Sequence, residues 1–175
     1  ERTSKSKKAN EAYDAGVRYY SLRNFDAAIT QLQSAIQSDP RFIEAYLMLG
    51  QVYEDNGNPK EAISAYQKGL AINEKFYPGG LLTLAGLQFT EGYYSDALQS
   101  YTRFISLYSG NGSQKALAQR GIRQCEYALN AIKNPVDFRP INLGSSINTN
   151  LDEYWPALSA DEKTLMITRL IPDTD

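Results

Sequence analysis

A period of 34 residues runs through the first two thirds of this 175-residue chain and constrains its fold more than any other feature. Small and aromatic residues recur in pairs at that spacing: Gly16 with Gly50, Tyr19 with Tyr53, and Ala28 with Ala62. One further step of 35 residues leads from Ala62 to Ala97. A fixed period of this length is typical of stacked copies of one supersecondary unit. Such arrays present long concave surfaces that bind other molecules, so the sequence predicts a binding or scaffolding module.

Each period is expected to contain two helices joined by a short turn. In the second copy, apolar or small residues recur at the i, i+3, i+4 and i+7 positions of one helical face: Tyr46, Leu49, Gly50 and Tyr53. The turn-forming run at 55–58 ends this helix. Pro59 then suits the first turn of the next helix, where a missing N–H costs nothing. Glycine and alanine at the crossing points, among them Gly16 and Gly50 facing Ala28 and Ala62, are expected to let the two backbones approach closely.

C-terminal to the repeats, the pattern of residues 113–132 predicts one more helix, which would cap the array with a polar outer surface. Its expected apolar stripe contains Leu117, Ile122, Cys125, Ala128, Leu129 and Ile132. Residues 134–151 have the composition of a linker. Two β-prone runs around a polar turn then predict a hairpin within residues 152–175. The expected organisation is therefore a helical domain over 1–133, a linker over 134–151 and a β-forming tail over 152–175.

The composition excludes several classes of function. The net charge of −2 gives no electrostatic case for a nucleic-acid partner. The chain has no histidine, and Cys125 is its only cysteine, so Ser-His-Asp and Cys-His catalysis and Cys-based zinc sites are excluded. No calcium loop or phosphate loop is present, and no apolar signal core follows the basic start. We expect a protein without cofactor, metal or catalysis, in which Cys125 is a buried structural thiol.

The repeats resemble the tetratricopeptide repeat, whose signature is W-x2-L-G-x2-Y followed by A-x3-F and P. The run AYLMLGQVY followed by NPKEAISAY is the best match, with Tyr46 in the place of the Trp and Tyr66 in the place of the Phe. The first copy keeps the small residues, and the third is degenerate, with Ala85 at the Gly position. The resemblance covers about residues 9–133 and implies an all-α, right-handed α-α superhelix of three repeats plus a capping helix, with a short C-terminal β-forming tail.

A second resemblance lies in the tail. The run EYWPALSADEKTL resembles a blade of a TolB-like, WD-type β-propeller, through Glu153, Tyr154, Pro156, Ser159, Asp161 and Leu165. Tetratricopeptide repeats before such a propeller and an OmpA-like domain resemble outer-membrane lipoproteins of Bacteroidetes, some of them in type IX secretion. This resemblance implies an N-terminal fragment of a protein on the periplasmic face of the outer membrane. Peptidoglycan would be bound only by an OmpA-like domain absent from this chain.

Tetratricopeptide arrays usually bind extended peptides on the concave face formed by the first helix of each repeat. The residues projected onto that face are Asn10, Tyr13, Val17, Tyr20, Glu44, Leu47, Gln51, Glu54, Leu82 and Phe89. Aromatic and aliphatic side chains with few charges are typical of interface cores, so the ligand would be an apolar, neutral or slightly basic segment. Alternatively, these side chains pack between helices or are covered by the tail. The Lys, Arg and Asn clamp of chaperone-binding relatives is absent.

Two functions follow from this sequence. The first is a non-catalytic module that binds a protein or peptide partner within a periplasmic assembly, with the fragment itself a monomer. The alternative is an autonomous intracellular adaptor that self-associates through its C-terminal tail. The first predicts a constant mass in solution, and the second predicts a dimer that depends on concentration.

Overall fold

A computed structural model of the chain describes residues 2–110, 112–137, 139, 141–142, 144–145, 147, 150, 153–161 and 163–169. The chain divides into two compact units, Glu1–Pro135 and Val136–Asp175. The first unit is helical and the second contains a two-stranded sheet. Each unit is described by itself.

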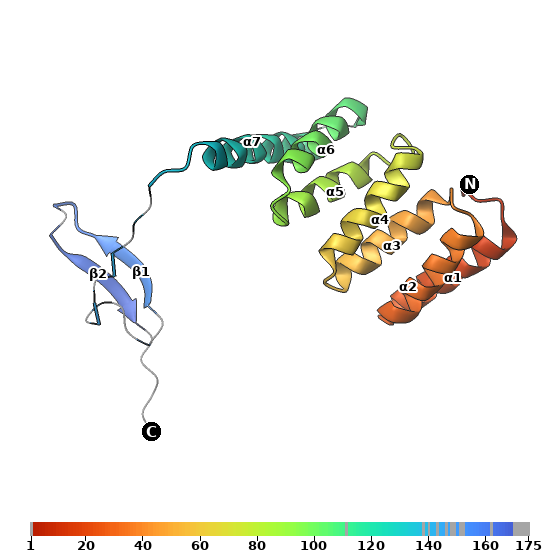
Figure 1. Ribbon diagram of the computed structural model, residues 1–175, viewed down its shortest axis with the longest axis horizontal. Helices are drawn as coiled ribbons and strands as arrows, with labels where there is room; N and C mark the ends of the chain where they lie inside the picture. The colour runs from red at the N-terminus through yellow and green to blue at the C-terminus, as the bar shows by residue number, and fades with distance from the viewer. Residues whose placement is uncertain are drawn as a thin grey trace, which may run out of the picture. The chain divides into compact units, whose positions relative to one another are not determined.

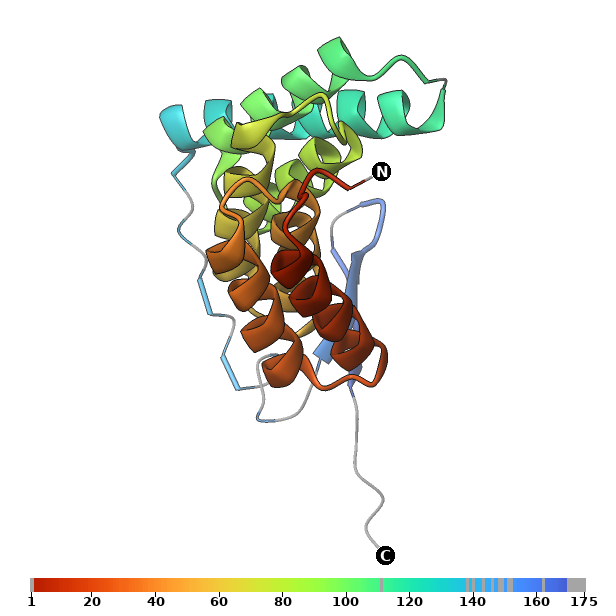
Figure 2. The ribbon, with the colours of Figure 1, turned by 90° about the vertical axis from the view of Figure 1, so that its right-hand side faces the viewer.

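Seven helices follow one another in the described part of the first unit (Figure 1). Their bounds are α1 (Lys7–Ser21), α2 (Phe25–Ser38), α3 (Ile43–Asp55), α4 (Pro59–Ile72), α5 (Gly79–Thr90), α6 (Tyr94–Leu107) and α7 (Ser113–Lys133). Each helix packs on the next one in the chain, and α1 and α2 lie side by side (Figure 2). This arrangement confirms the predicted fold class: three helix pairs in an α-α superhelix, followed by one more helix.

The turn inside each pair has the same backbone geometry in all three repeats. One residue with positive φ closes the first helix: Arg23 (57°), Gly57 (74°) and Gly92 (80°). The next backbone N–H reaches five residues back in each case, as Asn58 N does to the Tyr53 carbonyl at 2.8 Å. These contacts satisfy carbonyls that a helix end otherwise leaves without a partner. Glycine adopts positive φ without strain, whereas Arg23 does so at a cost.

Close approach of the paired helices explains two glycines of the repeat. A Cβ on Gly16 would lie 2.7 Å from Cγ of Leu32, and a Cβ on Gly50 would lie 2.9 Å from the ring of Tyr66. The predicted close approach is therefore present. The residue that fills each space is the Leu or Tyr at the aromatic position of the motif, not the alanine expected there, although Ala28 and Ala62 are fully buried.

The capping helix packs mainly through small residues, so the predicted apolar stripe is wrong at Leu117 and Ile132 but confirmed at Cys125 and Ile122. Ala118, Gly121 and Cys125 are its buried positions, while Leu117 and Ile132 are 55% and 65% exposed. The reason is the ring of Tyr101 on α6, which occupies the space over Gly121 that a Cβ would fill. Leu117 and Ile132 lie on the outer side of α7, whereas Ile122 packs against the core. Cys125 is fully buried, as predicted, and its burial raises the pKa of the thiol.

The second unit contains an antiparallel hairpin of β1 (Glu153–Leu158) and β2 (Leu165–Arg169). Leu158 pairs with Leu165, and the register is irregular between Tyr154 and Ala157. Pro156 lies in that interval and has no N–H for the ladder. In the turn, Ser159 N donates to the Thr164 carbonyl at 2.9 Å. The predicted hairpin is thus present.

Across the part of the chain that the structure describes, no helix combines the length and apolar character needed to cross a membrane.

Candidate functional site

A groove of about 490 Å³ lies on the face formed by the first helices of the repeats. It is present because successive helix pairs stack, which brings α1 against α3. Side chains of α1, α3, α4 and α5 and of the connection between α4 and α5 line it. They are Tyr13, Glu44, Leu47, Met48, Gln51, Tyr66, Phe76, Tyr77 and Thr83. Most are apolar or aromatic, so this groove is the candidate functional site.

Four of the ten residues projected onto the concave face line this groove. They are Tyr13 on α1 and Glu44, Leu47 and Gln51 on α3. All four are half-buried, so part of each side chain is packed within the fold. Leu47 also packs against the largest core cluster, which holds its side chain in place at the floor of the groove.

The other six residues have contacts within the protein. The Tyr20 hydroxyl donates to Asp55 Oδ2 at 2.5 Å, which ties the end of α1 to the end of α3. Leu82 and Phe89 pack on the core, and the Phe89 ring lies edge-on to Tyr94 at 5.3 Å. Asn10, Val17 and Glu54 also lie outside the lining of this groove, although all three are half-buried.

Sequence reasoning missed two exposed aromatic residues of the groove, Phe76 and Tyr77. They are 40% and 54% exposed and lie in the connection between α4 and α5. This connection spans residues 73–78, whereas that between α2 and α3 spans only 39–42. The 35-residue step between the second and third repeats was the signal that could have found them, since an inserted residue must lie in a turn. The longer connection brings both rings to the concave face.

Burial changes the acid–base properties of two groups beside the groove. Desolvation raises the pKa of Glu54, and the neighbouring Asp55 carboxylate raises it further. Desolvation likewise raises the pKa of Tyr66, whose hydroxyl donates to Glu54 Oε2 at 3.4 Å. The lining of the groove contains no lysine or arginine. A ligand with an anionic end would therefore find no cation among the lining residues.

Ionisation of Tyr66 predicts a loss of stability at alkaline pH. A tyrosine of the unfolded chain ionises near pH 10, whereas Tyr66 keeps its proton to a higher pH in the folded chain. The stability from keeping this phenol neutral is fully present below about pH 10 and is lost as the pH rises through the folded pKa. We expect Tyr66 to lower the free energy of unfolding by up to about 1.4 kcal/mol per pH unit above pH 10.

Urea unfolding at several values between about pH 9 and 11 checks this expectation. Tyr66→Phe should have a shallower decline than the unchanged chain, because it has no phenol to ionise. Buried tyrosines elsewhere, such as Tyr101, leave a residual slope. Identical slopes in the two proteins would contradict the assignment.

The described residues contain no group of three or more histidine, cysteine, aspartate or glutamate side chains placed to hold a metal ion. The groove instead presents apolar side chains, the aromatic rings of Phe76 and Tyr77, and the polar groups of Gln51 and Thr83. These are the features of a surface that binds another chain.

Comparison with known proteins agrees with this geometry. The tetratricopeptide repeat family model matches residues 13–79. A peroxisomal targeting signal receptor of Komagataella phaffii is 30% identical over 96 residues, which are 54% of this chain. The chain spans only 16% of the length of that receptor.

Solved structures show the same fold. The first TPR domain of Spaghetti (RPAP3) bound to the HSP90 peptide SRMEEVD has a TM-score of 0.60 at 21% identity, covering 71% of this chain and 95% of that one. The TPR2B domain of yeast Sti1 in complex with pHsp70 has a TM-score of 0.59 at 19% identity, covering 70% of this chain and 98% of that one. Identities this low establish the fold alone. Residues 13–79 of the helical unit match the tetratricopeptide repeat family, and the unit has the fold of tetratricopeptide repeat domains.

Proposed function

We propose that this chain is a non-catalytic module that binds an extended peptide segment of a partner protein in the groove between α1, α3 and α5. The observation that carries the proposal is the half-exposed aromatic pair Phe76 and Tyr77 beside Leu47 in a single hollow. Large rings that are held by the fold and remain open to solvent are typical of interface anchors. The RPAP3 domain, which has the same fold, is bound to a peptide in its solved structure, and this supports a peptide-binding role for the fold.

The chemistry of the groove defines the class of ligand. Leu47, Met48, Phe76 and Tyr77 favour apolar or aromatic side chains, whose burial contributes about 25 cal/mol per Å². Gln51 can donate to and accept from the backbone of an extended chain. Because Glu44 is the only charged residue of the lining, a neutral or slightly basic segment is favoured over an acidic one. A basic clamp that binds a carboxylate would have the opposite preference, for an acidic ligand.

Selection from a displayed library of short random peptides tests the proposal. We expect the enriched peptides to carry apolar or aromatic residues and few acidic ones. Titrating one of them into the isotope-labelled chain should shift the backbone amide resonances of Leu47, Gln51 and Thr83. A second hollow, of about 440 Å³, provides the internal control, because Gln33, Ile36, Ser64 and Lys68 in its lining lie on the second helices of the repeats. Shifts confined to that hollow, or no enrichment, would contradict a concave binding site.

The cellular context that we propose is the periplasmic face of the outer membrane, in an assembly anchored by a separate peptidoglycan-binding domain. Its support is the resemblance of the tail to a propeller blade, together with the hairpin over 153–169 that carries the matching residues Pro156, Ser159 and Asp161. The alternative remains an intracellular adaptor that self-associates through the tail. Fractionation of the source cells, with sedimentation of the purified chain over a range of concentrations, distinguishes the two. Recovery in the soluble intracellular fraction would contradict the periplasmic context.

A further inference from the structure

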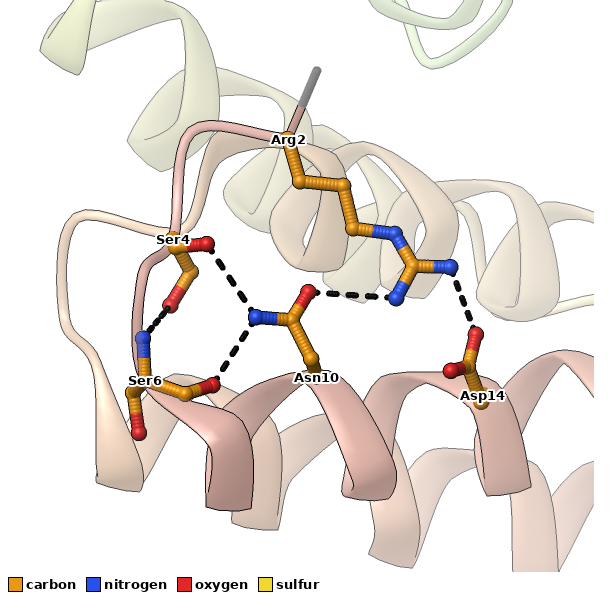
Figure 3. A network of polar contacts seen from close by, with 5 residues as sticks. All are labelled: Arg2, Ser4, Ser6, Asn10 and Asp14. Carbon is orange, nitrogen blue, oxygen red and sulfur yellow. Dashed lines mark hydrogen bonds and ion pairs between the residues drawn. The ribbon is translucent and has the colours of Figure 1, made fainter.

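The chain's own residues 2–6 pass over the start of α1, where Arg2 and Ser4 contact Asn10 (Figure 3). Ser4 is 3% exposed, so this segment is packed on the helices. Two of the residues that contact it, Tyr13 and Glu44, also line the groove. The segment and the groove are therefore continuous. We define the Arg-Thr subsite as the four residues of α1 and α3 that hold Arg2 and Thr3, namely Asn10, Tyr13, Asp14 and Glu44.

Arg2 is held by three different kinds of contact. Its guanidinium lies over the ring of Tyr13, 4.8 Å from the ring centre. Nη2 donates to Asp14 Oδ1 at 2.6 Å, and Nη1 donates to Asn10 Oδ1 at 3.1 Å. The amide of Asn10 is fixed in turn, because its Nδ2 donates to the carbonyls of Ser4 (3.1 Å) and Ser6 (2.8 Å). A planar cation that both stacks on a ring and donates to a carboxylate is recognised as arginine rather than lysine.

Thr3 is recognised through its backbone and its hydroxyl together. Its N–H donates to Glu44 Oε1 at 2.9 Å, and its hydroxyl donates to Glu44 Oε2. The same hydroxyl accepts the N–H of Ile43 at 3.1 Å. The N-cap residue of α3, Phe42, provides no side-chain cap of its own, so the Thr3 hydroxyl, 40 positions before Ile43, accepts this N–H at the start of the helix. Glu44 is thereby used as a double acceptor for an incoming extended chain.

We propose that the Arg-Thr subsite recognises an arginine followed by a threonine or serine in an extended partner segment, and that the chain's own Arg2 and Thr3 fill it in competition with that partner. This inference rests on the proposed peptide-binding function. It adds that the partner carries an Arg-Thr or Arg-Ser pair, and that the chain's own first residues compete with it. A partner would place its Arg-Thr pair on α1 and α3, and its apolar residues along Leu47 and Tyr77.

The exposure of the Arg2 pairing favours an exchangeable occupant of this position over a permanent part of the fold. The side chains of Arg2 and Asp14 remain 39% and 56% exposed although they are paired, and exposed ion pairs contribute little to stability. The pairing nevertheless matches in charge and shape, since an acidic and aromatic surface receives a basic segment. A tethered occupant acts at an effective concentration in the millimolar range. It therefore weakens every partner that needs the same subsite.

The double variant R2A/T3A of the full chain tests the proposal, with Ile43 as the reporter. Loss of the Thr3 hydroxyl removes the acceptor of the Ile43 N–H, so the Ile43 amide resonance should move in the variant. Adding a free peptide with the sequence of residues 1–6 should return this resonance toward its original position. The variant should bind that peptide about tenfold or more tightly than the unchanged chain does. Peptides with Arg replaced by Lys, or Thr by Val, serve as matched controls and should bind more weakly.

The variant D14N/E44Q, combined with R2A/T3A, should lose this response while keeping its helical circular dichroism. If the free peptide leaves the Ile43 resonance unmoved although library-selected peptides bind in the groove, the Arg-Thr subsite is overturned and the proposed function stands. Residues 2–6 would then be only a cap for α3. If neither kind of peptide binds, both proposals fail. Equal binding of the Lys and Val control peptides would also overturn the recognition of an Arg-Thr pair.

Discussion

Replacing Phe104 by alanine is expected to lower the free energy of unfolding by about 3–5 kcal/mol. The Phe104 side chain is fully buried in the cluster shared by α4, α5, α6 and α7, and its ring stacks on Tyr108 at 4.8 Å between centres. Deleting the ring removes its transfer free energy and leaves a cavity among residues that are themselves held by the cluster. Phe104 lies on α6, the helix against which α7 packs.

Because repeats contact mainly their neighbours, the loss should not be uniform along the chain. We expect native-state hydrogen exchange to become faster in α6 and α7 first, whereas the amides of α1 and α2 keep much of their protection. Urea unfolding followed by circular dichroism gives the total change. Phe76→Ala is the matched control, because it deletes the same ring from a position that is 40% exposed. Equal losses in the two variants would contradict the assignment of Phe104 to the core.

Replacing Tyr77 by alanine is expected to weaken binding of a library-selected peptide about 30-fold or more, which corresponds to about 2 kcal/mol. The ring is 54% exposed in the free chain and lies beside Leu47 and Phe76 in the groove. Its burial by a ligand would therefore contribute both apolar area and ring contacts. Since more than half of its surface is exposed in the fold, the free energy of unfolding should change less than for the fully buried Phe104.

Fluorescence anisotropy with a labelled selected peptide measures this effect. Tyr127→Ala is the control of the same chemistry, because Tyr127 is 77% exposed on α7 and lies outside the lining of the groove. Its affinity should stay close to that of the unchanged chain. Loss of affinity in both variants, or in neither, would show that the ligand does not use the ring of Tyr77.

The sequence predicted the helix pairs and their turns because the interactions that form them are local. Gly57 and Gly92 close helices a few residues away, and Pro59 begins one at its own position. The glycines at the first two crossing points, Gly16 and Gly50, were also predictable, since the partner helix follows directly in the chain. The rotation of α7 was not, because it depends on how the Tyr101 ring of another helix fills the space over Gly121. An apolar stripe read from α7 alone cannot include that ring.

The candidate site divides in the same way. Tyr13, Glu44, Leu47 and Gln51 could be placed on the groove from helical spacing, because that spacing specifies which way a helix directs each side chain. Phe76 and Tyr77 belong to a connection, whose path depends on the helices at both its ends.

By itself, then, the sequence determined the repeat, the number of helix pairs and the face on which the first helices meet. These properties follow from short-range periodicity and from turn residues with particular backbone preferences. Only the tertiary structure decided that Arg2 and Thr3 lie on Tyr13 and Glu44, contacts that span up to 41 positions of the chain. No periodic pattern encodes such a contact, because it forms only after the stacking of two repeats has brought α1 and α3 together.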